Sequence, residues 1–124
     1  MIRRWPTPRY VSEARAAVGP ARLSAFTRRV FRKRPRCCAV CGRARHLQVA
    51  HLVAVAEQHA LALREKNTVT LCLACHRAFD SLVGVLPLGS RLYIDPAPRI
   101  ARYPAAFDAL AAQRALLEVA YAPR

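Results

Sequence analysis

Two cysteine-containing stretches decide how this chain folds: residues 37–42 read CCAVCG, and residues 67–80 read NTVTLCLACHRAFD. Each stretch contains a Cys-x-x-Cys pair, and 30 residues separate one pair from the other. Four thiolates from two such pairs can close a tetrahedral shell around a zinc ion, with bonds of about 2.3 Å. A closed shell has no position for substrate, so this zinc would be structural. The predicted zinc ligands are Cys38, Cys41, Cys72 and Cys75.

The composition gives a reason why this chain would need a structural zinc. The 124 residues suffice for one modest core, and 54% of them are hydrophobic, but alanine supplies much of that fraction and buries little area. A zinc site would add folding energy that a small alanine-rich core lacks. The fifth cysteine, Cys37, either replaces Cys38 as a ligand or, as we expect, is a spare thiol.

The charge is strongly positive, with 21 Lys plus Arg against 7 Asp plus Glu, a net charge of +14 and a pI near 11.2. Nearly all of these cations are arginines, whose guanidinium groups can bind a phosphate through two hydrogen bonds. The balance favours a polyanionic partner such as nucleic acid, although biased codon usage would also give an arginine-rich chain. The arginines that we expect to contact phosphate are Arg28, Arg29, Arg32, Arg34, Arg36 and Arg77.

We divide the chain into three segments of one compact domain, and residues 1–36 are the first. Residues 1–10 contain two prolines and three arginines, so we expect an extended basic arm. A helix from Ser12 should break at Gly19-Pro20, and a second helix should begin there and end in the basic run that follows. The apolar face of that second helix would consist of Leu23, Phe26 and Val30.

Residues 37–82 form the second segment, in which the zinc pairs alternate with strand and helix signals. Residues 47–51 alternate as a strand does, and residues 68–71 are rich in β-branched side chains, which favour a second strand. Residues 53–65 lack a strand pattern and should form a long loop or a short helix, whereas residues 75–82 should form a helix. The predicted order is strand, loop, strand, helix.

Residues 83–124 form the third segment. We predict a hairpin with arms at 85–86 and 92–94, a proline-rich connector at 95–98, and an amphipathic helix from Pro104 to about Tyr121. The fold class is therefore α+β, with helices on both sides of a zinc-stapled ββα core. The last helix would cover either the core or a second copy, so a homodimer is an open alternative. Its apolar residues are Phe107, Leu110, Leu117 and Val119.

Several side chains outside the predicted zinc shell suit a second metal ion and acid–base chemistry. His76 and Asp80 are four residues apart, so on a helix they would project from one face, where they could share a divalent cation; such a pair is also common as a plain surface hydrogen bond. His51 follows a predicted strand, and the ordinary pKa of histidine leaves it largely neutral at physiological pH, as a general base must be.

Taken together, these residues resemble the HNH branch of the ββα-metal (His-Me finger) nucleases over about residues 37–82. The resemblance rests on the first histidine after a strand, on Asn67 five residues before the third cysteine, and on His76 directly after the fourth. It implies that His51 is the general base, that Asn67 braces the loop and orients His51, and that His76 and Asp80 bind Mg²⁺ or Mn²⁺.

One position departs from the family pattern. Many members carry Asp or His directly before the base, where it is another metal ligand, and this chain has Ala50 there. A subgroup with an Ala-His-Ile string and a final His-x-x-Phe-Asp is more similar to this chain. Two protein ligands would suit Mg²⁺, which keeps several waters. A ligand role for His51 is also open.

The predicted function is metal-dependent hydrolysis of DNA, because His51, Asn67, His76 and Asp80 occur together and a pure binding module does not need them. The resemblance implies that cleavage leaves a 5′-phosphate and a 3′-hydroxyl. The alternative is a non-catalytic zinc-ribbon protein that binds nucleic acid, which the charge and the cysteines would equally support. Double-stranded DNA is the expected partner. No apolar run is long enough for a membrane span, and we expect a cytoplasmic, bacterial or phage-encoded protein.

Overall fold

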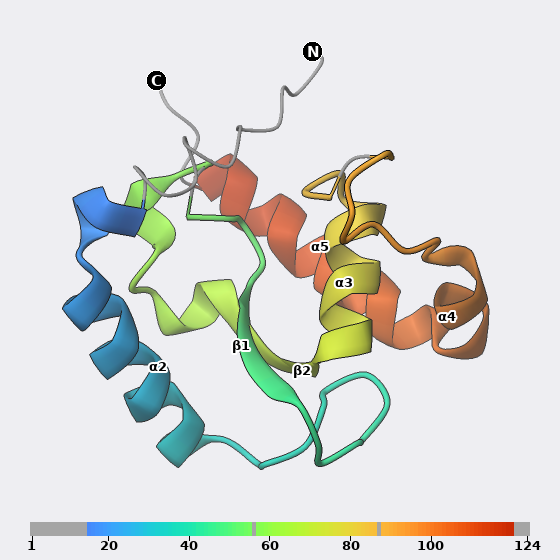
Figure 1. The fold of residues 1–124 in the computed structure, drawn as a ribbon, viewed down its shortest axis with the longest axis horizontal. Helices are drawn as coiled ribbons and strands as arrows, with labels where there is room; N and C mark the ends of the chain where they lie inside the picture. Colours follow the sequence, from blue (N-terminus) through green and yellow to red (C-terminus); the bar gives the residue numbers. More distant parts are fainter. Residues whose placement is uncertain (1–14, 56, 87, 121–124) are drawn as a thin grey trace.

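The computed structural model describes residues 15–55, 57–86 and 88–120. Within them the chain forms an α+β fold in which a two-stranded sheet lies between helices (Figure 1). The predicted arm at 1–10 and the start of the first helix at Ser12 lie outside the described residues. In chain order the elements are α2 (Pro20–Lys33), β1 (Leu47–His51), the 3-10 turns His59–Leu61 and Glu65–Asn67, β2 (Thr68–Cys72), α3 (Leu73–Leu82), α4 (Ala97–Arg102) and α5 (Pro104–Ala120).

The helices at the N-terminal side follow the sequence signals. Residues 15–18 are helical, and the helix breaks at Gly19, whose φ of 107° suits a residue without a side chain. Pro20 then opens α2, and its apolar face is buried through Leu23, Phe26 and Val30, as predicted.

The strands β1 and β2 pair antiparallel, with Leu47 opposite Cys72 and His51 opposite Thr68. In the described part of the loop between them, the two 3-10 turns are the only regular elements, in line with the absence of a strand pattern there. Because α3 begins directly after β2 and packs against both strands, the sequence strand, loop, strand, helix forms a ββα unit. Helix α2 lies beside β1 on the opposite flank (Figure 1).

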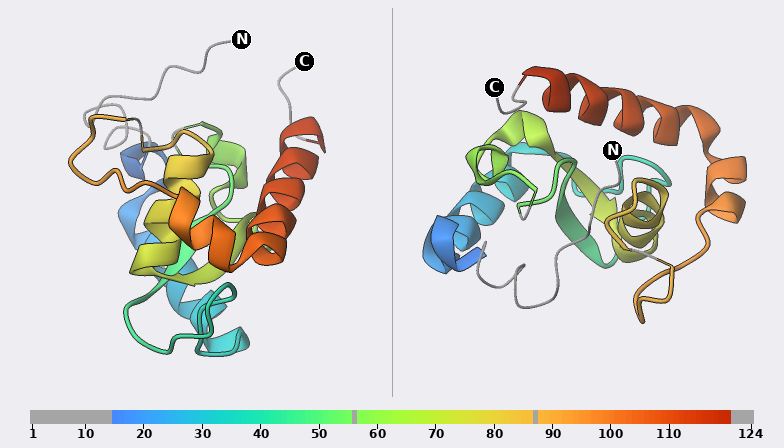
Figure 2. Two further views of the ribbon diagram at one scale, coloured as in Figure 1. Left: turned by 90° about the vertical axis from the view of Figure 1, so that its right-hand side faces the viewer. Right: turned by 90° about the horizontal axis from the view of Figure 1, so that it is seen from above.

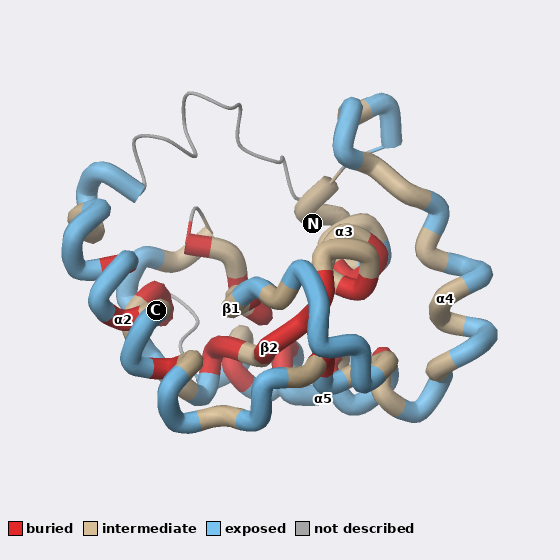
Figure 3. The backbone as a smooth tube through the Cα atoms, turned by 60° about the horizontal axis from the view of Figure 1, so that its bottom comes forward, coloured by how far each residue is buried: buried red, intermediate tan, exposed pale blue. Residues whose placement is uncertain are grey.

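Helix α5 runs along one side of the molecule, past the sheet (Figure 2). It buries Phe107, Leu110 and Leu117 in the main core, together with residues of the sheet and α3. The inclusion of Val119 in its apolar face was wrong, because this side chain is 80% exposed. Buried residues concentrate in β2 and the inner face of α3, whereas α2 and α4 are largely exposed on their outer sides (Figure 3).

The predicted hairpin at 85–94 is wrong. Among the described residues only β1 and β2 are strands, and residues 88–96 form turns and irregular chain. The physical reason is that both predicted arms bond to the end of α3 instead of to each other. The N–H of Leu86 donates to the carbonyl of Asp80, and the N–H of Ile94 donates to Oγ of Ser81.

The predicted connector at 95–98 is also partly wrong, because helix α4 begins at Ala97. Asp95 accepts a hydrogen bond from the N–H of Ala97 through Oδ1, at 3.0 Å, which orders the turn into the helix. Pro98 is tolerated in the first helical turn, where a missing N–H costs no intrahelical bond. No helix among the described residues is long and apolar enough to cross a membrane.

Candidate active site

Four cysteines converge where the knuckle at 38–41 meets the junction of β2 and α3. The sulfur atoms of Cys38, Cys41, Cys72 and Cys75 all lie within 4.8 Å of one another, and those of Cys41 and Cys72 are 3.7 Å apart. Ligands at about 2.3 Å from a tetrahedral zinc would be about 3.8 Å apart, so the spacing fits zinc. Cys37 is outside the cluster, as expected for a spare thiol.

Backbone N–H groups donate to two of these sulfurs. Sγ of Cys38 accepts from the N–H groups of Val40 and Cys41, and Sγ of Cys72 accepts from that of Cys75. Burial raises the pKa of Cys38, but these and other hydrogen bonds outweigh it and lower the pKa to about 7. Gly42 closes the knuckle with a φ of 77°, the left-handed conformation that glycine adopts without strain.

The other two cysteines need a cation to stay charged, because burial raises the pKa of Cys41 and of Cys75. Arg99 of α4 supplies positive charge at one of them, because its Nη1 lies 3.3 Å from Sγ of Cys75 and can donate a hydrogen bond to it. Sequence reasoning missed Arg99, since it belongs to the helix that the sequence did not predict.

His51 ends β1 and is held in one orientation. Its Nε2 lies 2.8 Å from the carbonyl oxygen of Ala62, and its ring stacks on Phe26 of α2, with centroids 6.3 Å apart. A carbonyl only accepts, so Nε2 carries the hydrogen, and Nδ1 of the neutral ring keeps a free lone pair. Within the described part of the chain no group donates to Nδ1.

The charge state of His51 is set mainly by burial, which lowers its pKa. The hydrogen bond to Ala62 opposes this, Arg15 and His76 lower the pKa further, and Asp80 raises it. The result is a lowered pKa, so the ring is neutral over a wider pH range than a free histidine. The contribution of His76 and Asp80 also indicates that β1 and α3 bring these three side chains into one electrostatic neighbourhood.

Asn67 is fully buried, and its side chain bonds to two separate points of the loop between β1 and β2. Its Oδ1 accepts from the N–H of Val53 at 2.8 Å, and its Nδ2 donates to the carbonyls of Val53 at 2.9 Å and Leu61 at 3.1 Å. Leu61 precedes Ala62, whose carbonyl holds His51. Asn67 thus reaches His51 through the loop rather than by direct contact.

His76 and Asp80 share one face of α3, as their spacing predicts. Nε2 of His76 lies 3.2 Å from Oδ2 of Asp80, and Nδ1 lies 2.5 Å from Oε1 of Gln48 on β1. Both acceptors are oxygens, so a neutral ring that donates to Gln48 presents the lone pair of Nε2 to a carboxylate. A divalent cation bound between the two would remove that contact.

The distance of 3.2 Å between Nε2 of His76 and Oδ2 of Asp80 also fits a divalent ion. Adjacent ligands at about 2.1 Å from an octahedral Mg²⁺ lie about 3.0 Å apart, which is close to the separation of His76 and Asp80. Gln48 would act by fixing which nitrogen of His76 faces the ion. The sequence contained a signal for Gln48, a polar residue two positions before the buried Ala50 and thus on the same face of β1.

The six arginines expected to bind phosphate lie in different settings. Arg29 is near Glu65, at 3.9 Å, and Arg34 donates to the carbonyl of Glu65 at 2.7 Å, so these two are engaged within the protein. Arg77 lies on α3 and lines a small pocket beside the cysteine cluster. The remaining three, Arg28, Arg32 and Arg36, line a pocket between α2 and the start of β1.

A further residue that the sequence analysis missed is Arg114 of α5, which is 4% exposed. It donates to both carboxylate oxygens of Glu57, at 3.0 and 2.7 Å, to the carbonyl of Leu52, and lies 2.9 Å from Glu118. Leu52 follows His51 directly, so α5 fixes the backbone next to the candidate base. Arg114 falls in the apolar stripe of α5, between Leu110 and Leu117, and that position was the available signal.

Comparison with known proteins agrees with this geometry. Residues 38–80 match the family model for HNH endonuclease, from the first cysteine of the cluster to Asp80. No curated protein and no solved structure gives a significant match to the chain. The matched segment contains both strands, helix α3 as far as Asp80, the four cysteines that could hold a metal ion, and the candidates His51, Asn67, His76 and Asp80. Over residues 38–80 the chain is therefore similar to the HNH endonuclease family.

Proposed function

We propose that this protein is a metal-dependent endonuclease that hydrolyses phosphodiester bonds in DNA. The observation that carries the proposal is the state of His51 within the segment that matches HNH endonucleases: Nε2 bonds to the Ala62 carbonyl, no described group donates to Nδ1, and burial lowers the pKa of the ring. A neutral histidine with one free nitrogen is equipped to take a proton from water. A protein that only bound nucleic acid would not need this arrangement.

In the proposed reaction Nδ1 of His51 accepts a proton from a water molecule, and the water oxygen attacks the phosphorus atom. The bond from phosphorus to the 3′ oxygen breaks, and that oxygen takes up a proton from solvent. The products are a 5′-phosphate and a 3′-hydroxyl. Asn67 acts as a positioning residue, because it holds the loop whose carbonyl orients the His51 ring.

His76 and Asp80 would hold one divalent cation, Mg²⁺ or Mn²⁺, with Gln48 orienting His76. When bound, that ion would stabilise negative charge on the phosphate and the departing oxygen. Ala50 is buried and cannot replace the ligand found there in other family members. The remaining positions around the ion would be filled by water and by phosphate oxygens, which suits Mg²⁺.

The four cysteines would hold a structural zinc, separate from the catalytic ion. Their cluster is closed and partly buried, and it joins the knuckle at 38–41 to the start of α3, the helix that carries His76. Zinc would therefore fix the position of the second metal site through the backbone. The net charge of +14 and the arginines that are not engaged by Glu65, namely Arg28, Arg32, Arg36 and Arg77, support nucleic acid as the substrate, and we propose double-stranded DNA.

The proposal is tested by incubating the purified, zinc-loaded protein with supercoiled plasmid in the presence of Mg²⁺, in the presence of Mn²⁺, and with no added divalent ion. We expect nicked or linear DNA only when an ion is added, with ends that DNA ligase reseals because they carry 5′-phosphate and 3′-hydroxyl groups. Plasmid binding without cleavage under every condition would favour the alternative, a zinc-ribbon protein that only binds nucleic acid.

A further inference from the structure

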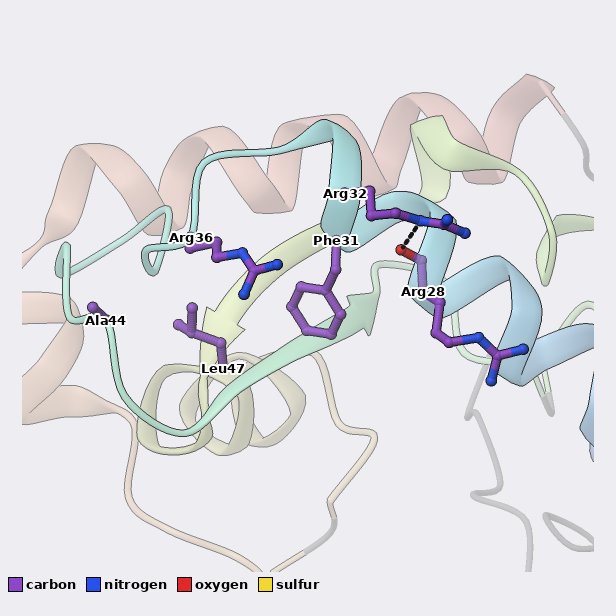
Figure 4. Close-up of a pocket in the computed structure, with 6 residues that line it drawn as sticks. All are labelled: Arg28, Phe31, Arg32, Arg36, Ala44 and Leu47. Atoms are coloured by element: carbon purple, nitrogen blue, oxygen red, sulfur yellow. Dashed lines mark hydrogen bonds between the residues drawn. The ribbon is translucent and has the colours of Figure 1, made fainter.

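A basic pocket on the described surface lies outside the candidate active site. It has a volume of about 570 Å³, within the range of about 300–1,000 Å³ typical of small-ligand sites. Residues of α2, of the chain that follows it and of the start of β1 line the pocket (Figure 4). The lining residues are Arg28, Phe31, Arg32, Arg36, Ala44 and Leu47.

The pocket combines an apolar floor with three cations. Phe31 and Leu47 are only partly buried, and Figure 4 shows them together, with Arg28 and Arg36 on either side of the Phe31 ring. Phe31 is not among the buried residues of α2, which are Leu23, Phe26 and Val30. Its ring is partly exposed and lines the pocket beside Leu47, so one edge of an aromatic side chain is open to a ligand.

The charges of this pocket are not neutralised within the described residues. On the adjoining flank of α2, Glu65 forms ion pairs with Lys33, at 3.1 Å, and with Arg29, at 3.9 Å. No described carboxylate pairs with the three arginines of the pocket; Arg32 donates only to the carbonyl of Arg28. On α2, therefore, the charges of Arg29 and Lys33 are paired with Glu65, whereas Arg28 and Arg32 have no paired carboxylate among the described residues and can bind an anion.

We propose that this pocket binds one unpaired nucleotide of the DNA substrate, with its base stacked on Phe31 and its phosphates held by Arg28 and Arg36. An aromatic ring stacks with any base, and arginines supply phosphate contacts and can stack in their turn. Paired bases in a duplex present no free face to such a ring. The inference rests on the proposed function for the identity of the substrate, and it adds to that function a preference for duplex DNA that adjoins an unpaired nucleotide.

The position of the pocket supports this assignment. Leu47 begins β1 and His51 ends it, and four steps of about 3.4 Å along the strand separate the pocket from the candidate base by about 14 Å. The two sites therefore lie along one strand, close enough for a single nucleic acid to reach both. The pocket would set which bond of a branched or tailed duplex lies next to His51.

The experiment measures binding of fluorescein-labelled oligodeoxynucleotides by anisotropy, without Mg²⁺ or Mn²⁺ so that no cleavage occurs. The probes are a blunt duplex, the same duplex with a single-stranded tail, and the single strand alone. Phe31→Leu keeps an apolar side chain and removes the ring, whereas Phe31→Tyr keeps the ring. Arg91→Gln, at an exposed turn away from the pocket, is the control for loss of one charge.

We expect Phe31→Leu to weaken binding of the single strand and the tailed duplex by about 5- to 150-fold, the loss that removal of one base-stacking contact gives. Binding of the blunt duplex should stay within about twofold of the wild type, since the phosphate contacts remain. Phe31→Tyr should bind all three probes as the wild type does. Arg28→Gln should weaken the single strand more than Arg91→Gln does.

Two results would overturn the proposal: equal weakening of all three probes by Phe31→Leu, or a Phe31→Tyr variant as weak as Phe31→Leu. Circular dichroism and zinc content, measured on each variant, show whether it is folded, and the exposed Arg28→Gln tests the same pocket without touching its floor. The readout is binding and does not depend on cleavage. A protein that cuts no DNA under any condition would therefore refute the nuclease proposal, whereas the binding data alone would decide the nucleotide-pocket proposal.

Discussion

Asn67→Ala removes a buried side chain that makes three hydrogen bonds to the backbone of the loop. Three bonds are lost, to the N–H and carbonyl of Val53 and to the carbonyl of Leu61. At about 1 kcal/mol net for each bond, the loss is about 3 kcal/mol. Val53 is 3% exposed and Leu61 is 0% exposed, so their backbone groups are left without water, which raises the total to about 3–5 kcal/mol.

The assay is urea unfolding of the zinc-saturated protein, followed by circular dichroism. The matched control is Gln113→Ala, which removes one exposed bond to the same turn, from Nε2 to the carbonyl of Lys66 at 2.7 Å. We expect the control to cost about 0.5–1 kcal/mol, well below the cost at Asn67. A loss below about 1 kcal/mol for Asn67→Ala would refute the reasoning that this side chain holds the loop. Cleavage by this variant should also fall, since the carbonyl that orients His51 belongs to that loop.

Three further predictions concern metal, pH and salt. The purified protein should hold about one zinc per chain, and Cys72→Ser should unfold it or make it insoluble; a folded, monodisperse sample without zinc would contradict this. Burial lowers the pKa of His51, so between about pH 6.5 and the folded pKa the unfolded chain binds more protons and stability falls as pH falls. Urea unfolding at about pH 7 and about pH 5.5 should therefore show a larger loss for the wild type than for His51→Gln, and an equal loss would argue against a buried neutral ring. DNA affinity should fall steeply with salt because arginines displace counterions from phosphates, and affinity that stays constant from low to high salt would exclude the charge as its source.

Local signals were sufficient to predict most of the ββα unit. The alternation at residues 47–51 and the β-branched run that begins at Thr68 correspond to β1 and β2, and Pro104 opens α5 as expected. These patterns act over a few residues, so a single sequence contains them in full. The same holds for Gly42, whose positive φ the knuckle requires.

The parts that sequence reasoning missed depend on partners far along the chain. The arms of the predicted hairpin bond to Asp80 and Ser81 at the end of α3, and nothing in their own sequence indicates that choice. The partner of His51 is a backbone carbonyl 11 residues away, across an irregular loop. A carbonyl has no sequence signature, so only the folded chain could identify Ala62.

The candidate site divides in the same way. Spacing and family resemblance pointed to His51, Asn67, His76 and Asp80. The fold brings His51, His76 and Asp80 near one another, whereas Asn67 reaches His51 only through the loop. Their catalytic roles are still predictions. Gln48 joins the site from β1, where its Oε1 lies within hydrogen-bond distance of Nδ1 of His76.

The measurement that tests the central claim most directly is the rate of plasmid cleavage by His51→Ala with saturating Mg²⁺, beside the wild type and His59→Ala. His59 is exposed and outside the site, so its variant should cut at the wild-type rate. His51→Ala should keep its zinc and its DNA affinity and lose about 10²- to 10⁴-fold in rate, the usual contribution of a general base. His76→Ala should also lose activity, but raised Mn²⁺ should partly restore it and should not restore His51→Ala. Cleavage by His51→Ala at the wild-type rate would contradict the assignment of His51 as the base.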